Sequence, residues 1–454
     1  MRSNLAISRI IFVVGYIAVC LQLAAQDMWS VDRCMAYAIE HNRTVRQRNY
    51  EVDNYKIDRM NAIGNFLPGI NGSSSFQYSW GRSVDPETNT YNNISTFNNS
   101  YMLEASLTVF NGGNLVNQLR KSKVAQLMGK AALEAEQDNT AIETFQAYID
   151  ALYYYGTVKL ARKKLAESDS LLRKTRRQEE LGLKGLADVA QIEAQYATDD
   201  YTLTNQTNLY EAAMLALKQQ MNFPLDEQLA LDTTLLCTKA IDLALMPGDT
   251  SDEIFGTALE LNPTLQQSWY NSEVYRFEMK RSWANVLPTI SVFAGINTSY
   301  YKMLDGTGYP NFWQQLQNNF GQYVGMSISI PLFDGFSRVN AVRKAKNNYR
   351  IAFEQYETQK EELHKLVAQA VLDRNGFLKE SIQLERKVHS DSIAYRVTRR
   401  KFEEGLMTSL DVQTSASTLL ESEVTLLRSK LSYVLKCRLV DYYKGNELIN
   451  GKNI

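Results

Sequence analysis

The chain has 454 residues, of which 49 are Lys or Arg and 50 are Asp or Glu, so its formal net charge is −1. This near balance provides no basic surface for a polyanion and excludes nucleic acid as an expected partner. The chain contains four cysteines, and their wide spacing is not that of a disulfide framework. They are Cys20, Cys34, Cys237 and Cys437.

The N-terminus has the layout of an export signal. Two arginines precede or begin an apolar run at 10–18, and two alanines follow it just before Gln26. The run is too short for a stable membrane-spanning helix, so we predict a signal peptide over residues 1–25 that is removed on export. The alternatives are an uncleaved signal anchor and lipid attachment at Cys20. Val19 disfavours lipid attachment, because a small residue is usual immediately before the lipidated cysteine.

The rest of the chain repeats one pattern at an interval of about 220 residues. Asn65–Pro68 matches Asn285–Pro288, and Val109–Gly112 matches Leu332–Gly335. An internal duplication of this kind determines the whole fold. Each repeat is predicted to contain a helix, two strands and two further helices. The predicted parts are a first repeat over 26–223, a linker over 224–250, a second repeat over 251–445 and a C-terminal tail over 446–454.

Segments of alternating polarity predict the strands. Apolar and small residues alternate with polar ones from Ile70 to Trp80, from Tyr101 to Val109 and from Val324 to Ile330. Such segments, about ten residues long with one apolar face, are typical of outer-membrane β-barrels. No later stretch reaches about 18 apolar residues, so strands must make any membrane crossing in the mature chain. The alternative is a soluble antiparallel sheet with one solvated face.

Polar segments at 82–99 and 301–322 are predicted to be extracellular loops that join the strands of each pair. Their Asn, Thr, Gly, Tyr and Trp residues suit turns and the aromatic zone at a membrane surface.

Two long tracts without proline predict the helices. Proline is absent between Pro86 and Pro224 and after Pro331, and it would cost about 3 kcal/mol inside a helix. Helices beginning near Asn114 and Arg338 are predicted to run to about Leu181 and Glu404, and at 1.5 Å per residue each would be about 100 Å long. Such helices cannot be buried in a compact domain. A plain coiled coil is the alternative, but it would need no strands.

Four strands per chain cannot close a barrel, and an open sheet edge is not stable in lipid. The chain must therefore oligomerise. Two copies would give eight strands and an interior filled by side chains, whereas three would give twelve and room for a channel.

With these features the chain resembles the TolC-like outer-membrane efflux proteins, over nearly all of its mature length. The resemblance implies an α+β membrane protein, a homotrimer whose twelve-stranded β-barrel crosses the outer membrane of a Gram-negative bacterium and contacts its lipid. A long α-helical barrel would continue it through the periplasm. It also implies two partners, a periplasmic adaptor (a membrane fusion protein) and an inner-membrane pump of the RND or ABC type.

The most specific part of the resemblance is a turn of the form Gly-Leu-x-x-x-x-Asp-Val, which occurs once in each repeat. Glycine can end one helix in a left-handed conformation, and aspartate favours the start of the next. Turning the chain is therefore one explanation of the motif. Apolar leucines on such a turn also suggest a docking surface, and the family docks its adaptor at this tip. The residues assigned to docking are Gly182, Leu183, Gly405 and Leu406.

The family also closes this tip with polar side chains. Asp188 and Asp411 match its aspartates, and we expect Asp411, repeated in a trimer, to narrow and charge the entrance. Phe402 stands where a tyrosine is frequent and Met407 where an arginine occurs. A polar lock of the family's kind is therefore in doubt for this chain.

The sequence contains no recognisable catalytic or metal-binding motif. His41, His364 and His389 have no metal-ligand spacing, and no phosphate-binding glycine motif is present. We therefore predict no enzyme activity, no cofactor and no metal. The predicted function is a passive exit duct for efflux or type I secretion, and the substrate is not readable. The alternative is a structural or adhesin-like spacer of the cell envelope, anchored by its barrel.

Overall fold

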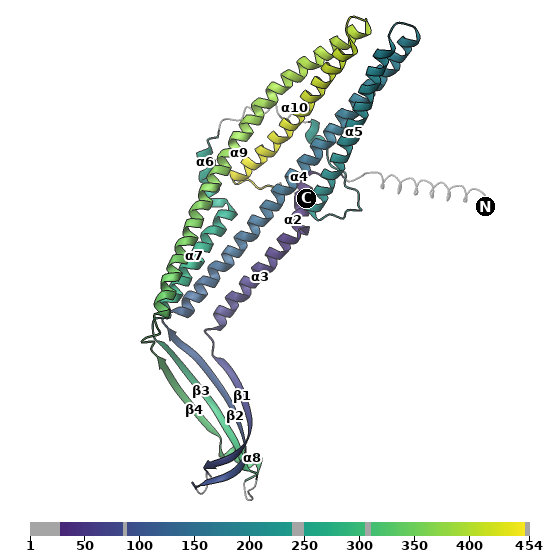
Figure 1. Ribbon diagram of the computed structural model, residues 1–454. Coiled ribbons are helices and arrows are strands. Elements are labelled where there is room, and N and C mark those ends of the chain that lie inside the picture. The colour runs from purple at the N-terminus through teal and green to yellow at the C-terminus, as the bar shows by residue number, and fades with distance from the viewer. Residues whose placement is uncertain (1–27, 85–88, 238–248, 305–309, 450–454) are drawn as a thin grey trace, which may run out of the picture. The chain divides into compact units, whose positions relative to one another are not determined.

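The computed structural model of the protein describes residues 28–84, 89–237, 249–304 and 310–449 (Figure 1). The predicted signal peptide and Cys20 lie outside these residues. In chain order the elements are α2 (Val31–His41), α3 (Arg43–Gly64), β1 (Gly69–Val84), β2 (Tyr91–Asn111), α4 (Asn114–Glu180), α5 (Leu186–Met221), η1 (Thr234–Cys237), α6 (Ser251–Leu261), α7 (Pro263–Ala284), β3 (Thr289–Met303), α8 (Phe312–Asn318), β4 (Gly321–Ser329), α9 (Ser337–Glu403) and α10 (Ser409–Tyr443).

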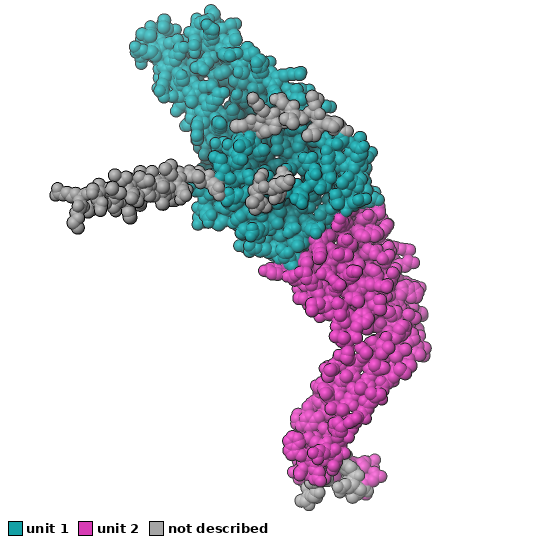
Figure 2. Space-filling view, turned by 180° about the vertical axis from the view of Figure 1, so that it is seen from behind, with its two compact units in different colours: residues 1–49, 132–263, 360–454 teal, residues 50–131, 264–359 magenta. Residues whose placement is uncertain are grey.

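The chain forms two compact units, coloured separately in Figure 2. The first comprises residues 1–49, 132–263 and 360–454, and the second comprises residues 50–131 and 264–359. The second unit holds the whole sheet. The first holds the ends of both long helical hairpins, α4–α5 and α9–α10. Among the described residues, the helices lack the combination of length and apolar character needed to cross a membrane.

The sheet consists of four antiparallel strands in the order β1-β2-β3-β4. Its register places Ile70, Ala105, Ala294 and Val324 side by side across the four strands. This row belongs to an apolar face that is open in the single chain, where Ile70 is 67% exposed and Val324 85%. The alternation of polarity that predicted the strands therefore divides the sheet into two chemically different faces.

The opposite face of the sheet is polar and carries side-chain hydrogen bonds between strands. The hydroxyl oxygens of Ser75 on β1 and Ser100 on β2 lie 2.7 Å apart. The Tyr323 hydroxyl on β4 donates to Glu104 Oε2 on β2 at 2.7 Å. These contacts hold non-adjacent and adjacent strands together on the side away from the apolar residues.

The predicted loop at 82–99 is wrong over most of its length. β1 continues to Val84 and β2 begins at Tyr91, and the two strands pair residue by residue across this stretch. Its Asn and Thr residues favour turns when considered singly. Cross-strand packing outweighs that preference, as between Tyr78 and Phe97, whose ring centroids are 4.7 Å apart.

The segment predicted as a loop at 301–322 contains the short helix α8. Gln315 of α8 is buried, and its side-chain amide bonds both backbone groups of Tyr301 on β3, each at 2.9 Å. The ladder between β3 and β4 ends at Asn297 and Gly321. The Gln315 side chain therefore takes the place of a neighbouring strand for the part of β3 that extends past β4.

The two long helices match their prediction closely. α4 and α9 each contain 67 residues, which corresponds to about 100 Å. The single helix predicted before the strands is instead divided in two, in both halves of the chain. The breaks are at Asn42 and Asn262, whose backbones are extended, with ψ of 132° and 118°. Asn42 then caps α3, because its Oδ1 accepts from Thr44 N at 2.7 Å.

The main core of the first unit gathers α2, α4, α5 and part of the predicted linker. Tyr148 of α4 is 1% exposed, and its hydroxyl lies 3.0 Å from Trp29 O and 2.8 Å from Asp232 O. Leu229 and Leu231, from the linker, are buried in the same cluster. Residues 238–248 of the linker lie outside the described residues. These two leucines attach the described part of the linker to the core, whereas residues 224–228 are exposed.

Candidate functional site

Each long hairpin turns through a glycine in the left-handed conformation. Gly182, with φ of 72°, follows α4, and Gly405, with φ of 77°, follows α9. The Leu183 amide donates to Gln178 O and the Leu406 amide donates to Lys401 O, each at 2.8 Å. These hydrogen bonds, each from an amide to the carbonyl five residues earlier, are characteristic of the Schellman motif. The motif provides donors for carbonyl groups that have no partner at the end of a helix. The predicted helix-ending role of both glycines is confirmed.

The helix that follows each turn is capped by the predicted aspartate, and the second cap is the stronger. Asp411 Oδ2 accepts from Thr408 N at 2.9 Å and from Thr408 Oγ1 at 2.7 Å. The Thr408 Oγ1 atom accepts in turn from Asp411 N at 3.3 Å. In the first hairpin Asp188 Oδ2 accepts from Gly185 N at 3.4 Å, and glycine has no hydroxyl to return the bond. The hydrogen bonds from Thr408 hold the pKa of Asp411 below its usual value.

Both turns present leucine side chains to the surface. Leu183 is 70% exposed and Leu406 is 71% exposed. Leu186 and Leu410 lie in the first turns of the next helices and are also exposed, at 73% and 57%. Sequence reasoning overlooked these two, although an apolar residue in the first turn of a surface helix was a readable signal. Neighbouring apolar side chains that remain open to solvent are the usual character of an interaction surface.

Phe402 and Met407 have a different environment from the exposed leucines. Phe402 is 1% exposed and lies in a cluster that joins the two hairpins, with Met407 packed against it. The Lys184 Nζ atom lies 4.2 Å from the centre of the Phe402 ring, a cation–π contact between the hairpins. The buried members of this cluster are Leu171, Leu172, Val189, Ile192, Phe402 and Val412.

Polar contacts also join the hairpins close to the turns. Ser409 Oγ lies 2.6 Å from Gln191 Oε1, and Lys174 Nζ lies 3.1 Å from Glu403 Oε2. The candidate site is thus a pair of packed helix ends with a hydrophobic centre and leucines on its outer surface. The sequence-based prediction placed Phe402 among the entrance residues. The helical periodicity of one helix does not show which of its residues a second hairpin will cover.

The basic residues before the turns are largely balanced by nearby acids. Arg173 lies 2.5 Å from Asp169, and Arg177 lies 2.7 Å from Glu180. Such exposed pairs contribute about 0–1 kcal/mol each. This local pairing is typical of solvated helix faces.

Nothing in the described residues resembles a metal centre. No three His, Cys, Asp or Glu side chains among them are grouped so as to hold an ion. His41 stacks on Tyr37 at 3.9 Å between ring centroids, and His364 stacks on Phe255 at 4.3 Å. The imidazoles of these two residues therefore lie in separate aromatic contacts.

A protein-family model described as "Outer membrane efflux protein" matches residues 36–222 and 254–436. The chain belongs to the outer membrane efflux protein family. It is a protein of the Gram-negative outer membrane that extends into the periplasm.

Two curated relatives of this outer membrane efflux protein are similar over most of their length. The outer membrane protein TolC of Vibrio cholerae serotype O1 is 22% identical over 309 residues, which cover 66% of each chain. The alkaline protease secretion protein AprF of Pseudomonas aeruginosa is 20% identical over 329 residues, which cover 72% of this chain and 66% of the relative. The chain thus spans just under two thirds of the length of both.

Solved structures share the fold over more of the chain. A structure of CusC, from a study of folding and transmembrane channel formation, superposes with a TM-score of 0.78 at 17% identity and covers 92% of each chain. VceC from Vibrio cholerae gives a TM-score of 0.77 at 15% identity, covering 92% of this chain and 96% of that one. These likenesses establish the shared fold, mostly helical with a four-stranded antiparallel sheet in each chain.

Proposed function

We propose that this outer membrane efflux protein forms a homotrimer that acts as a passive exit duct, supplied by an inner-membrane pump through a periplasmic adaptor. The observation that carries the proposal is the open sheet. Its outer strands, β1 and β4, each have one edge without a strand partner among the described residues. In lipid an unsatisfied backbone group costs several kcal/mol, so a sheet with one apolar and one polar face must close with other copies.

Three copies fit a duct better than two. Two would supply eight strands, whose interior side chains fill, whereas three would supply twelve and leave an aqueous lumen. The antiparallel order β1-β2-β3-β4 also allows β4 of one copy to pair antiparallel with β1 of the next. Closure in this way directs the apolar face toward lipid and the serine-rich face toward water.

Cross-linking at the sheet edges tests the number of copies. In a chain whose native cysteines are replaced, Ser75→Cys on β1 and Ser327→Cys on β4 place thiols on the polar face of the two outer strands. A short bifunctional reagent should give a ladder that ends at the trimer. The control pair is Ser100→Cys with Ser299→Cys, which lie directly opposite each other within one chain and should link internally. A ladder that ends at the dimer would contradict the twelve-stranded barrel.

The periplasmic adaptor is proposed to dock at the leucines of the two hairpin turns. Leu183 and Leu406 are exposed on turns that the adjoining backbone hydrogen bonds already hold in shape, so they serve no evident packing role within the described chain. Leu406→Glu should reduce export in cells and leave trimer assembly unchanged. Leu225→Glu, at an exposed leucine of the linker, is the control. Export that survives in Leu406→Glu would remove the docking role.

Asp188 and Asp411 are proposed to charge the entrance. Asp411 is the better candidate, because its hydrogen bonds from Thr408 keep it ionised to lower pH. Three copies would bring three such carboxylates to one ring. Asp411→Asn should weaken block by added cations, and unchanged block would contradict this assignment. Phe402 and Met407 support the entrance by packing the hairpins together.

The pump can be of the RND or the ABC type. The names of the relatives include both an outer membrane protein and a protease secretion protein, which supports efflux and type I secretion alike. The second candidate function is a barrel-anchored envelope spacer, favoured by helices about 100 Å long. A spacer does not need to conduct, and this difference separates the two.

A further inference from the structure

The two hairpins carry the same three types of polar side chain at corresponding positions, but the serine and the aspartate are exchanged between the two helices of the hairpin. Each hairpin has a lysine, a serine and an aspartate at positions 223 residues apart in the sequence. The first set is Lys164 and Ser168 on α4 with Asp199 on α5, and the second is Lys387 and Asp391 on α9 with Ser422 on α10.

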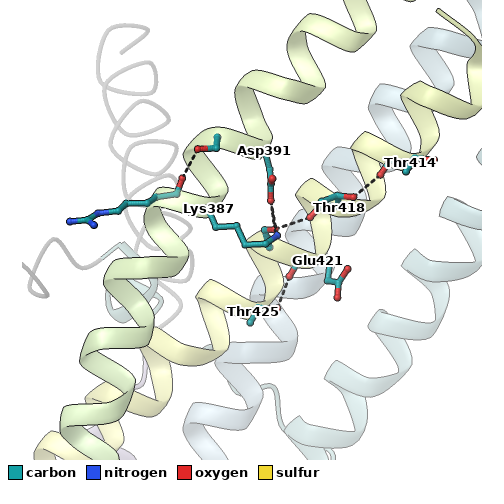
Figure 3. A network of polar contacts seen from close by, with 9 residues as sticks. Lys387, Asp391, Thr414, Thr418, Glu421 and Thr425 are labelled. Atoms are coloured by element: carbon teal, nitrogen blue, oxygen red, sulfur yellow. Dashed lines mark hydrogen bonds and ion pairs between the residues drawn. The ribbon is translucent and has the colours of Figure 1, made fainter.

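In the second hairpin all three side chains are joined. Figure 3 shows Lys387 and Asp391 directed toward each other. Lys387 Nζ lies 2.8 Å from Asp391 Oδ2 and also bonds Ser422 Oγ. The Ser422 hydroxyl lies 2.5 Å from Asp391 Oδ2. The hydrogen bonds of Lys387 and Ser422 hold the pKa of Asp391 below its usual value. This aspartate therefore serves as an ordinary ionised partner for a lysine.

In the first hairpin the aspartate is buried and its partners are incomplete. Asp199 is 5% exposed and Gln195 is 9% exposed. Gln195 Nε2 donates to Asp199 Oδ1 at 2.7 Å. The other oxygen of each group, Asp199 Oδ2 and Gln195 Oε1, is buried with no hydrogen-bond partner. Each buried acceptor without a donor is costly, and two acceptors cannot satisfy each other.

One proton resolves this arrangement. A proton on Asp199 Oδ2 turns that unpaired oxygen into a hydrogen-bond donor. The unpaired Gln195 Oε1 can then accept from it. The amide N–H already bonds the other carboxyl oxygen. We propose that Asp199 is a proton-binding site, at which a proton from solvent completes a two-hydrogen-bond acid–amide pair with Gln195.

The electrostatic environment agrees with this assignment. Burial raises the pKa of Asp199, and the opposing effects of Lys164, Ser168 and Gln195 leave it above the usual value. The Ser168 hydroxyl lies close enough to lower this pKa, but its proton is directed to Leu165 O at 3.0 Å, so Asp199 Oδ2 stays without a donor. Burial also lowers the pKa of Lys164. The other charged groups that face this lysine are Glu167 on α4 and Glu423 on α10.

Protonation of Asp199 then changes which charges attract Lys164. When Asp199 is ionised, Lys164 is drawn toward α5 of its own hairpin. When Asp199 is neutral, the acids left to it are Glu167 and Glu423, and Glu423 belongs to the other hairpin. Neighbouring contacts run the same way, since Lys163 lies 3.7 Å from Glu423 and the Tyr395 hydroxyl of α9 donates to Glu167 at 3.2 Å. Protonation of Asp199 thus weakens the attraction of Lys164 to its own hairpin and leaves its attraction to Glu423 of the other hairpin.

The two hairpins should respond to acid with opposite signs. A carboxyl whose pKa is raised by folding binds its proton more tightly in the folded state, so the contribution of Asp199 to stability grows as the pH falls through its folded pKa toward the ordinary value. The contribution of Asp391 is present above the ordinary value and is lost as the pH falls through its lowered folded pKa.

Infrared difference spectroscopy of the purified full-length oligomer tests the proposal through the C=O band of a protonated carboxylic acid. Burial also raises the pKa of Asp138, so the measurement is made with Asp138→Asn in every sample. We expect a band that titrates above the ordinary pKa of aspartate, is lost in Asp199→Asn and is retained in Asp391→Asn. The exchange Ser168→Asp with Asp199→Ser rebuilds the second hairpin's order and should also remove the band. A band that persists unchanged in Asp199→Asn would overturn the proposal.

A second variant keeps the test independent of how well Asp199→Asn folds. Gln195→Met removes the amide that donates to the acid's carbonyl oxygen, so the band should move to higher wavenumber. An unmoved band would exclude the acid–amide pair. Neither readout requires the protein to conduct or export, so their failure would leave the proposed duct untouched.

Discussion

Replacing Gly405 with alanine perturbs the turn that joins α9 to α10 and nothing else nearby. Gly405 has φ of 77°, and no atom lies within 4 Å of the place that a Cβ would occupy. The change therefore adds backbone strain without a steric clash. A left-handed conformation costs a residue with a Cβ about 1–2 kcal/mol. We expect the local stability of the turn to fall by about that amount.

Amide hydrogen exchange in detergent measures this loss. The reporter is the Leu406 amide, which donates to Lys401 O at 2.8 Å, and about 1–2 kcal/mol corresponds to roughly 5–30-fold faster exchange through local opening. Gly376→Ala is the matched control, because Gly376 lies inside α9 with open space beside it. Alanine is favoured there by about 0.5–1 kcal/mol, so exchange around residue 376 should slow. Unchanged Leu406 exchange in Gly405→Ala would show that the left-handed backbone at residue 405 adds no such strain.

Three further predictions concern packing, protonation and steric fit. Phe402→Ala should destabilise the tip by about 3–5 kcal/mol, because Phe402 is 1% exposed; a fall of less than about 1 kcal/mol in denaturant unfolding would contradict the buried position. The pKa of Asp411 is lower in the folded state than its ordinary, unfolded value. Its stabilising contribution is therefore present when the pH is above the ordinary pKa, and it is lost as the pH falls through the folded-state pKa. Hydrogen exchange in the first turn of α10 should show this pH dependence in the wild type and lack it in Asp411→Asn, and an equal dependence in both would exclude Asp411 as its source. Gly112→Ala should impair folding, because a Cβ there would lie 2.4 Å from the Ala284 carbonyl oxygen; a variant with wild-type melting temperature and yield would show that this contact yields easily.

The elements that follow from local chemistry were predictable from the sequence. The absence of proline between Pro86 and Pro224 predicted long helices in this tract, and the end predicted for the first, at about Leu181, lies within a residue or two of the end of α4. The glycines at 182 and 405 predicted helix ends because a positive φ is costly for other residues. The alternation of polarity also predicted which face of the sheet is apolar, since period two is a property of any extended chain.

The elements that depend on distant contacts were not predictable in this way. β1 extends to Val84 and β2 begins at Tyr91 because two polar segments pair with each other. The preferences of the individual residues favour turns there instead. Phe402 is buried because the other hairpin covers it. The burial of Asp199 likewise arises only when α4 and α5 are placed side by side, although its 223-residue relation to Ser422 is present in the sequence.

Planar-bilayer conductance of the detergent-purified, cross-linked oligomer is the most direct test of the central proposal, that this outer membrane efflux protein is a duct. We expect discrete current steps from the trimer, with cation block that weakens in Asp411→Asn. A pure and stable trimer that gives no steps in either the wild type or that variant, even when Phe402→Ala removes the packing between the hairpins at the tip, would contradict a duct and favour the envelope spacer.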